Sequence, residues 1–375
     1  MYLKEKPGRA WMEISIHNLQ HNYRQLQSFL PDKCNIMGVV KADAYGHGAV
    51  MISQNLCKEG CDFLAVASID EAIKLRNANI SASILILGYT LPQDAFLLYR
   101  YDLIQTIADE IHAKALSHSG YEIRAHLAID TGMNRLGIDY RDYDTIKKVI
   151  QMNGVRVEGV YSHFSVSDSS ADDDRKFTEK QICSFYGVKD KLEKDGFKNL
   201  VYHMQSSYGI LNYPMQGLQY ARPGIALYGC TSNDPKEKIP ISLRPVLQLK
   251  CRIGCIRMVP EGEFVSYGRT YEACEERRIA VAAIGYADGL PRSLSGKGFG
   301  LLHGKRIPVI GRICMDQTMF DITGLEDVKE GDTITLIGKD GKEEIRAVEM
   351  AKDAGTITNE LLSRLGSRLI RTYIE

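Results

Sequence analysis

A lysine followed by a tyrosine and two glycines stands at the end of an apolar run early in this chain. The run Ile36–Val40 predicts a buried strand, and Lys41, Tyr45, Gly46 and Gly48 follow it directly. An apolar wall beside an amine lowers its pKa, which frees it to act as a nucleophile or to form a Schiff base. The two glycines let backbone N–H groups approach a ligand closely.

This combination suits pyridoxal phosphate (PLP), because it offers one amine for the aldehyde and several donors for the phosphate. A lysine at a strand end is also common as a plain solvated terminus. The choice between these interpretations depends on the rest of the chain.

The composition excludes several classes of partner. Lys+Arg and Asp+Glu both total 47, so the net charge is zero and gives no sign of nucleic acid or an anionic membrane as partner. No apolar run approaches the roughly 18 residues of a spanning helix, so we expect no membrane contact by this chain. The nine cysteines lack metal-ligand spacing. We therefore expect reduced thiols, no metal and a cytoplasmic setting.

Short apolar segments alternate with amphipathic, charged stretches through the first two-thirds of the chain. Eight strands alternating with helices predict an α/β fold, a (β/α)8 TIM barrel whose carboxyl strand ends hold the active site. The alternative is a doubly wound open sheet, but no GxGxxG fingerprint follows the first strand. The predicted strands are Ile36–Val40, Phe63–Ala67, Ile84–Leu87, Leu103–Ile107, Ala125–Ile129, Val157–Tyr161, Leu200–His203 and Ile225–Tyr228.

A polar, turn-rich segment, Asn233–Lys238, ends this pattern. Short strands separated by glycines follow it and predict a mostly β C-terminal domain. Arg9–Ile16 also has the pattern of a strand and is expected to join that domain. The predicted domains are a PLP-binding barrel over residues 15–235 and a β-rich domain over residues 236–375 plus 1–14.

The chain resembles the alanine racemases, which are fold-type III PLP enzymes, and most closely the racemase domains of the vancomycin-resistance serine/alanine racemases. The resemblance extends over nearly the whole chain, and several motifs occur in the family's order. They are Lys41–Gly48, Asp130–Gly137, Glu158–Phe164, Arg222–Ile225, Val265–Gly268, Gly285–Gly289 and Gly311–Asp316.

The resemblance implies that Lys41 holds PLP as an internal aldimine and then serves as one acid/base. Tyr45, Ser207 and the N–H groups of Gly224 and Ile225 would bind the phosphate. Barrel topology agrees independently, because phosphate sites commonly follow strands seven and eight. For Ser207 taken alone, capping of a loop is an equally good interpretation.

Arg222 would face the pyridine nitrogen. A guanidinium only donates, so that nitrogen would stay unprotonated and the cofactor would be a weaker electron sink. His163 would bond Arg222 and relay to the second base. Without the resemblance, Arg222 would be interpreted as an ion-pair residue and His163 as a satisfied core histidine.

Tyr267 would be that second base, because racemisation needs one group on each face of the α-carbon. In the family this tyrosine comes from the other subunit, which implies a homodimer with shared active sites. A tyrosine with a pKa near 10 needs cationic or donor neighbours to act as a base at neutral pH.

Four further residues would contact the substrate or line its entrance: Arg135, Tyr286, Met315 and Asp316. Asp130 is expected to be a structural carboxylate at a strand end.

Two departures from the family pattern stand out. Ala128 occupies the position at which many members carry a carbamylated lysine, so Arg135 needs another carboxylate, an anion or a different pose. Asn359 replaces the usual tyrosine in Thr356–Glu360. The smaller asparagine offers room and a polar partner for a hydroxymethyl group. The alternative is that Asn359 only caps a helix that starts near Glu360.

The sequence therefore predicts a PLP-dependent isomerase that interconverts L- and D-alanine and also L- and D-serine, for cell-wall peptidoglycan precursors. The alternatives are a strict alanine racemase, a fold-type III decarboxylase and a PLP-binding regulatory protein. Arg222 argues against the decarboxylase, and the β domain with Tyr267 argues against the regulatory protein. The chain could be a whole cytoplasmic protein or the cytoplasmic domain of a membrane-anchored one.

Overall fold

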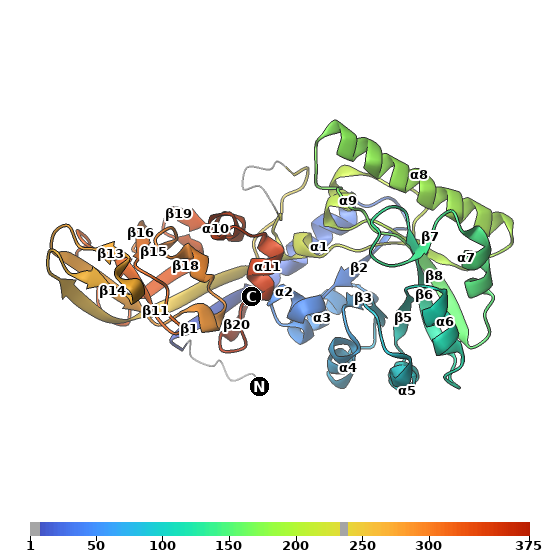
Figure 1. Ribbon diagram of the computed structural model, residues 1–375, viewed down its shortest axis with the longest axis horizontal. Helices are drawn as coiled ribbons and strands as arrows, with labels where there is room; N and C mark the ends of the chain where they lie inside the picture. The colour runs from blue at the N-terminus through green and yellow to red at the C-terminus, as the bar shows by residue number, and fades with distance from the viewer. Residues whose placement is uncertain (1–7, 233–238) are drawn as a thin grey trace.

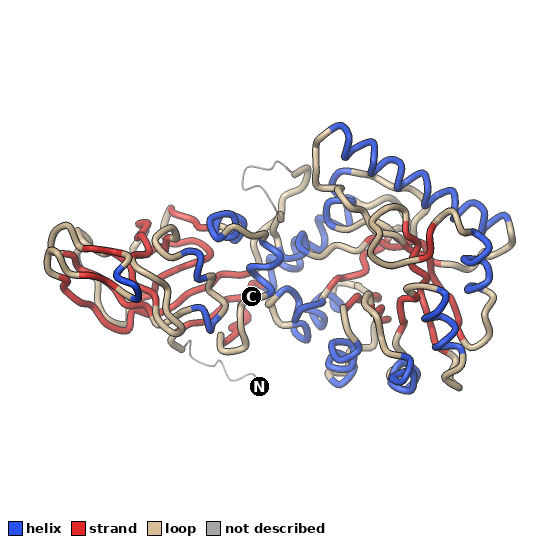
Figure 2. Tube along the Cα trace, viewed as in Figure 1, coloured by secondary structure: helices blue, strands red, loops and turns tan. Residues whose placement is uncertain are grey.

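A computed structural model describes residues 8–232 and 239–375 of the chain. It has two lobes: a barrel ringed by helices and a lobe made mostly of strands, with α2 and α11 close to their junction (Figure 1). The tube in Figure 2 shows the same division, with helices packed around one group of strands and few helices in the other lobe. Among the described residues, none of the helices combines the length and apolar character that crossing a membrane requires.

The barrel is a parallel sheet in the order β5-β4-β3-β2-β10-β9-β8-β6, closed by pairing of β5 with β6. This confirms the predicted TIM barrel. The short strands are buried along their whole length, as expected when helices cover one face and side chains fill the other. The strands are β2 (Asn35–Val39), β3 (Phe63–Val66), β4 (Ser83–Ile86), β5 (Ile104–Ile107), β6 (Ile123–Asp130), β8 (Val155–Tyr161), β9 (Val201–His203) and β10 (Tyr220–Ala221), with β7 (Ile138–Asp139) paired to β6.

One predicted strand is wrong. Residues Ile225–Tyr228 form a 3-10 helix, and the eighth strand is the two-residue β10, which pairs with β9 and β2. A short buried apolar run does not distinguish strand from helix by periodicity. Pro223 lacks an N–H for a sheet ladder, so the sheet ends before it. The turn that replaces the strand leaves orphan N–H groups at the barrel mouth.

Helices connect the barrel strands, and several begin at a polar capping residue such as Ser15, Ser68 or Asp109. They are α1 (Ile16–Phe29), α2 (Lys41–Tyr45), α3 (Ala49–Lys58), α4 (Ile69–Asn77), α5 (Ala95–Arg100), α6 (Glu110–Ser117), α7 (Tyr143–Ile150), α8 (Asp172–Lys194) and α9 (Ser207–Asn212), with 3-10 helices η1 (Pro92–Asp94) and η2 (Ile225–Tyr228).

The second lobe is a sheet in the order β19-β18-β15-β16-β17-β14-β11-β1-β20, with β18 also paired to β11. This confirms the predicted mostly β domain. Buried residues alternate with more exposed ones along the first part of β11, so one face of this strand packs on the core. The elements are β1 (Ala10–Ser15), β11 (Leu247–Val259), β12 (Phe264–Val265), η3 (Tyr267–Arg269), β13 (Tyr271–Glu272), β14 (Arg277–Ala282), η4 (Tyr286–Asp288), η5 (Arg292–Leu294), β15 (Phe299–Leu302), β16 (Lys305–Ile310), β17 (Thr318–Asp321), β18 (Thr333–Asp340), β19 (Glu343–Ile345), α10 (Ala347–Ala354), α11 (Thr358–Ser363) and β20 (Ile370–Ile374).

The two ends of the chain meet in this lobe. Strand β1 pairs antiparallel with β11 and parallel with β20, so the N-terminal segment belongs to the β sheet and then leads into α1 of the barrel. The predicted boundary between residues 235 and 236 and the predicted linker Asn233–Lys238 lie outside the described residues, as do residues 1–7.

Candidate active site

Lys41 opens a left-handed turn at the carboxyl end of β2. The four residues after it have positive φ angles of 53°, 51°, 56° and 52°, although none is glycine (Ala42, Asp43, Ala44 and Tyr45). The left-handed helical conformation costs about 1–2 kcal/mol per L-residue, so the turn stores roughly 4–8 kcal/mol. Contacts from elsewhere must hold it, because strain of this size persists only where the surroundings determine it.

Two carboxylates hold the start of the turn. Glu71 on α4 accepts the N–H of Ala42 at 2.6 Å through Oε1 and the N–H of Ala67 at 2.7 Å through Oε2. Asp43 accepts the N–H of Ala49 at 3.0 Å and pairs with Lys74. The turn is thereby fixed to β3, α3 and α4.

The C-terminal strand holds the other side of the turn. Arg371 on β20 donates to the carbonyl of Gly46 at 2.8 Å and pairs with Asp43, while the hydroxyl of Tyr373 donates to the carbonyl of His47. Gly46 has a φ of +82°, and a Cβ at this position would collide with the carbonyl of Leu362 on α11. The β lobe therefore helps to hold the lysine turn in place.

The amine of Lys41 sits in an environment that favours its neutral form. Burial lowers its pKa most, the charges of Arg135 and Arg222 lower it further, and Glu71 opposes them. No described residue forms a salt bridge or hydrogen bond with the amine. A neutral, unpaired amine is the form that attacks an aldehyde.

The residues predicted to bind phosphate converge beside the turn. Ser207 begins α9, and its Oγ accepts the N–H groups of Gly224 at 3.0 Å and Ala226 at 3.2 Å, so its own proton remains available to a ligand. Ile225 is the first residue of η2, where an N–H lacks an intrahelical acceptor. Burial raises the pKa of Tyr45 to about 12, so its hydroxyl stays a donor.

This cradle fits the phosphate of PLP. A Cβ at Gly224 would collide with the hydroxyl of Tyr45, so only glycine allows these donors to lie so close together. The donor set consists of two hydroxyls and the N–H of Ile225, arranged around the turn of Lys41. The sequence also predicts that the N–H of Gly224 binds phosphate. In the structure this N–H already donates to Oγ of Ser207.

Arg222 is a buried cation anchored through its two terminal nitrogens. Nη2 donates to the carbonyls of Ser162 at 2.7 Å and Met204 at 3.0 Å and lies 3.2 Å from Nδ1 of His163. Nη1 bonds Nδ1 of His203. Burial lowers the pKa of Arg222 to about 10, and the charge of Arg135 acts in the same direction. Its Nε–H has no protein partner in the described part of the chain and is the donor left for a ligand.

Three neutral histidines accompany Arg222. Burial lowers the pKa of His163, His203 and His126, so all three are uncharged near neutral pH. Because a guanidinium can only donate, Nδ1 of His203 must be an acceptor and its proton must sit on Nε2. That proton is then donated to Nδ1 of His126, 2.8 Å away. The chain of bonds fixes the tautomers and the plane of Arg222.

Arg135 stands on the loop after β6. Asp130 shapes this loop by accepting the N–H groups of Gly132 and Asn134, a structural role. Among the described residues no carboxylate lies within bonding reach of Arg135. A cavity of about 20 Å³ lies between Arg135 and Ala128, large enough for one water or one small anion. A protein carboxylate therefore does not replace the carbamylated lysine, which leaves an anion from solution or a changed pose.

The other predicted substrate residues lie on the β lobe. The backbone of Tyr286 donates to the carbonyl of Cys314, next to Met315, and Asp316 pairs with Arg368 at 2.6 Å. Tyr267 is 69% exposed at the start of η3. In one chain η3, which precedes β13, lies toward the outer end of the β lobe and far from α2 (Figure 1). A single chain does not bring Tyr267 to Lys41.

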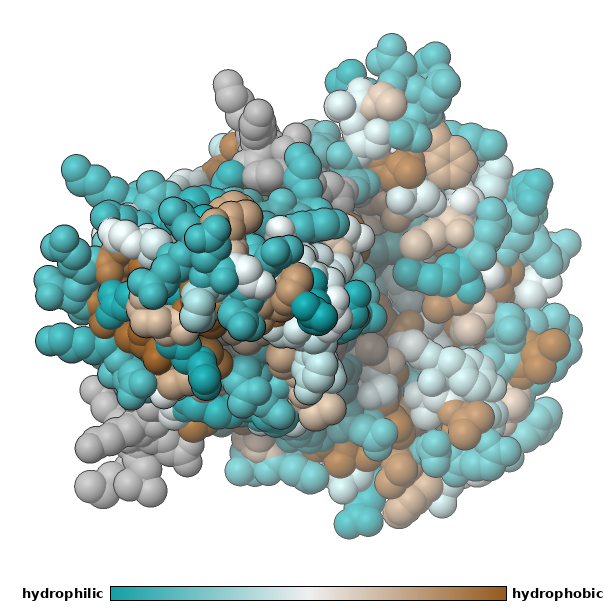
Figure 3. All heavy atoms as spheres, turned by 60° about the vertical axis from the view of Figure 1, so that its left-hand side comes forward, coloured by the Kyte–Doolittle hydropathy of each residue, from teal (hydrophilic) through white to brown (hydrophobic). Residues whose placement is uncertain are grey.

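Apolar surface surrounds Tyr267. An open cavity of about 490 Å³ is bounded by Tyr267, Val259, Phe264 and Met319. Figure 3 shows apolar atoms gathered on the forward face of this lobe, within a hydrophilic surround. Exposed apolar patches rimmed by polar residues commonly mark protein interfaces.

Asn359 is not a helix cap. Helix α11 begins at Thr358 with Ile357 as its N-cap, so the capping alternative is wrong. The N–H and hydroxyl of Thr358 are satisfied instead by the carbonyl of Ser232. The hydroxyl of Ser232 donates to Oδ1 of Asn359 at 2.8 Å, and its N–H donates to Tyr208, the neighbour of Ser207. Asn359 is thus tied to α9, the helix that begins at Ser207.

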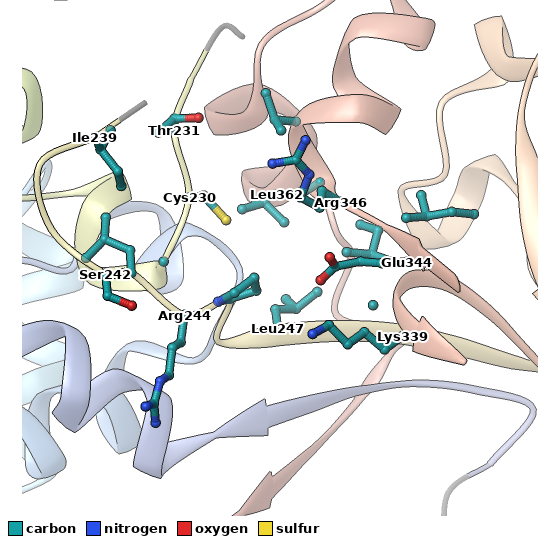
Figure 4. A pocket seen from close by; sticks show the side chains of 18 of the residues that line it. Cys230, Thr231, Ile239, Ser242, Arg244, Leu247, Lys339, Glu344, Arg346 and Leu362 are labelled. Atoms are coloured by element: carbon teal, nitrogen blue, oxygen red, sulfur yellow. The ribbon is translucent and has the colours of Figure 1, made fainter. Parts of the chain in front are cut away.

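A further cavity lies where the lobes meet. It measures about 460 Å³ and contains none of the predicted site residues. Figure 4 shows Arg244 on one side of it and Lys339, Glu344 and Arg346 on the other.

Two family models match the chain: alanine racemase, N-terminal domain, over residues 14–232, and alanine racemase, C-terminal domain, over residues 246–373. The chain belongs to the alanine racemase family. It is 43% identical over 363 residues to an amino-acid racemase of Enterococcus faecalis and 41% identical over 364 residues to a serine/alanine racemase of Enterococcus gallinarum. Each alignment covers 96% of this chain and 51% of the relative, so the chain spans about half the length of these relatives.

Solved structures agree. Alanine racemase of Clostridium difficile 630 superposes with a TM-score of 0.91 at 35% identity, covering 99% of this chain and 96% of that chain. The alanine racemase of Bartonella henselae with covalently bound pyridoxal phosphate superposes with a TM-score of 0.86 at 28% identity. The superposition covers 98% of this chain and 100% of that chain. Enzymes of this family are PLP-dependent isomerases, so the predicted family, enzyme class and cofactor are confirmed at that level.

The sequence analysis missed several residues that shape this site. Glu71, Arg371 and Tyr373 hold the lysine turn, and His203 and His126 orient Arg222. Only Glu71 had a local signal, because Ser68 and Glu71 have the spacing of a capping box. The others act across long sequence separations.

Because Ala128 cannot be carbamylated, the activity of this protein should not depend on bicarbonate. We expect equal turnover of alanine in bicarbonate-free buffer and in buffer with added bicarbonate. A family member that carries the carbamylated lysine is the control. Loss of turnover on removal of bicarbonate, restored by adding it, would show that another group is carbamylated.

Proposed function

We propose that this chain is a PLP-dependent racemase of alanine and serine that works with two bases, Lys41 and the Tyr267 of a second copy. The observation that carries the proposal is the unpaired Lys41 amine, whose pKa burial lowers, beside a cradle of donors sized for phosphate. Lys41 would hold the cofactor covalently, and Tyr45, Ser207 and Ile225 would hold its phosphate.

When bound, PLP supplies an electron sink for the electron pair that remains on the α-carbon when the α-proton is removed. Lys41 and Tyr267 lie on opposite faces of the α-carbon in this proposal. One takes the α-proton, and the other returns a proton to the opposite face, so the substrate loses one proton and gains one. Exchange with water then resets the two bases.

Arg222 would limit side reactions. Its Nε–H would be available to the pyridine nitrogen of the bound cofactor, and because the guanidinium keeps its proton at neutral pH, it would leave that nitrogen unprotonated. The bonds that Arg222 donates to Ser162, Met204, His163 and His203 keep the guanidinium in one orientation. A weaker electron sink shortens the life of the carbanion, which disfavours transamination.

A homodimer with shared sites accounts for the position of Tyr267. The tyrosine is exposed beside an apolar cavity on η3, which precedes β13 at the outer end of the β lobe, whereas α2, which begins at Lys41, lies near the junction of the lobes (Figure 1). A second copy whose barrel mouth covers this face would bring the two bases together. Tyr286, Met315 and Asp316, which lie on the same lobe, would then line the substrate entrance of the partner barrel.

Asn359 supports serine as a substrate. Its Oδ1 is held by Ser232, which leaves its amide N–H groups to face a substrate hydroxyl directly or through a water. Burying a hydroxyl without a partner costs roughly 1–3 kcal/mol, so this amide matters. We propose that the D-amino acids supply cell-wall peptidoglycan precursors and that vancomycin resistance is the setting, in the cytoplasm.

Lys41→Ala should abolish the borohydride-sensitive visible absorbance of the bound cofactor, because it removes the amine that would hold the aldehyde. Tyr267→Phe should keep that absorbance and lose racemisation in at least one direction. Spectra and chiral product analysis in both directions are the measurements. Two-way turnover retained by Tyr267→Phe would contradict the two-base assignment.

Mixing the two inactive variants tests the shared site. In a hybrid dimer one of the two sites receives both wild-type residues, so Lys41→Ala and Tyr267→Phe chains should together recover part of the activity. Hybrid formation is verified with differently tagged chains. Verified hybrids without any activity would count against a site composed of two subunits.

Asn359→Tyr should lower serine turnover about tenfold more than alanine turnover, which corresponds to about 1.4 kcal/mol of discrimination. The tyrosine would crowd the pocket and remove the polar partner of the substrate hydroxyl. Alanine turnover in the same variant is the internal control. An equal fall for both substrates would make Asn359 a scaffold residue and leave a strict alanine racemase.

A further inference from the structure

We propose that Glu71 is a positioning residue for Lys41: its carboxylate holds the left-handed turn at its first amide and places a negative charge beside the lysine amine. The inference rests on the proposed role of Lys41 as the residue that holds PLP. Glu71 touches neither substrate nor cofactor in this account, and it acts through the turn.

The geometry of Glu71 departs from that of an ordinary capping box. Ser68 caps α4 and accepts the N–H of Glu71 at 3.4 Å, which is the first half of the box. The second half would return the carboxylate of Glu71 to the N–H of Ser68. Instead its two oxygens accept the N–H of Ala67 and, from another strand end, that of Ala42. The carboxylate therefore joins the end of β3 to the residue after Lys41.

A carboxylate is needed for this bridge. Two N–H groups from different segments point at two acceptor oxygens, and an ionised carboxylate is the side chain that only accepts. A glutamine of the same shape has one acceptor and one donor, so its amide N–H2 would face a backbone N–H. One of the two bonds would be lost, and the first left-handed residue, Ala42, has no side chain to replace it.

The charge of Glu71 also acts on Lys41. The groups that face the lysine come from four elements: Arg135 after β6, His163 after β8, Arg222 after β10 and Glu71 on α4. His163 is neutral, and the two arginines oppose a proton on the amine, so Glu71 is the one carboxylate of the described chain that favours it. Asp43 holds the same turn, but its charge is matched by Lys74 and Arg371.

These two carboxylates provide a matched comparison. Asp43→Asn removes ion pairs from the turn but none of the charges that act on the lysine amine. Glu71→Gln removes a backbone bond and the charge beside that amine. A purely structural role predicts the same behaviour in both variants, whereas a positioning role predicts a difference in the titration of Lys41.

The experiment loads each full-length variant with PLP, dilutes it, and traps the remaining bound cofactor with borohydride over time and across a pH series. Glu71→Gln should release PLP about tenfold faster, the effect of losing one hydrogen bond to a charged group. Because the remaining cations disfavour a proton on Lys41, the midpoint of its pH profile should move to lower pH. Asp43→Asn should lower the melting temperature and leave that midpoint unchanged.

Each outcome decides the proposal. Equal changes of release rate and midpoint in both variants would make Glu71 a structural residue only. If Glu71→Gln changes neither the release rate nor the midpoint, Glu71 has no role in positioning Lys41. If Glu71→Gln does not fold, Glu71→Asp takes its place. It keeps the charge but cannot span both amides, so it should release PLP faster with an unchanged midpoint, and release at the wild-type rate would overturn the proposal. PLP trapped in Lys41→Ala would instead show that the Lys41 assignment itself fails.

Discussion

The site depends on one strained element, the left-handed turn that follows Lys41. Four consecutive non-glycine residues with positive φ are held by bonds from α4, α3 and β20, and α11 packs closely against the glycine that follows the turn. The turn begins at Lys41 and ends at Tyr45, whose hydroxyl lies against Gly224. Because β20 pairs with β1 in the β sheet, the second lobe contributes to the geometry of a site whose proposed cofactor-binding residues all lie on the barrel.

Charge balance is the second constraint. Arg222 and Arg135 are both near Lys41, and Arg222 is fully enclosed. Buried Arg222 and the more exposed Arg135 both lower the pKa of Lys41 and so favour its neutral, nucleophilic form. The neutral histidines around Arg222 accept or pass on its hydrogen bonds without adding charge. The arrangement thus combines a fixed guanidinium with an amine that is ready to react.

Much of the fold followed from the sequence because its signals are local. Seven of the eight predicted barrel strands overlap observed ones, since buried apolar runs between amphipathic helices are unambiguous in that order. The prediction of a strand at Ile225–Tyr228 was wrong because a buried apolar run after Pro223-Gly224 is equally compatible with a 3-10 helix. The left-handed turn and its supports could not be predicted, since Arg371 lies 325 residues from the carbonyl of Gly46 that it bonds. The alternative that Asn359 caps a helix was wrong because the carbonyl of Ser232, far away in sequence, accepts the N–H of Thr358 at the start of α11.

The central claim is that this turn makes Lys41 the residue that holds PLP. The most direct measurement is to reduce the PLP-loaded protein with borohydride, digest it, and locate the modified lysine by mass spectrometry of the peptides. The account predicts a single phosphopyridoxyl group on Lys41, in the peptide that contains Ala42–Gly48. Modification of a different lysine, with Lys41 unmodified, would contradict it.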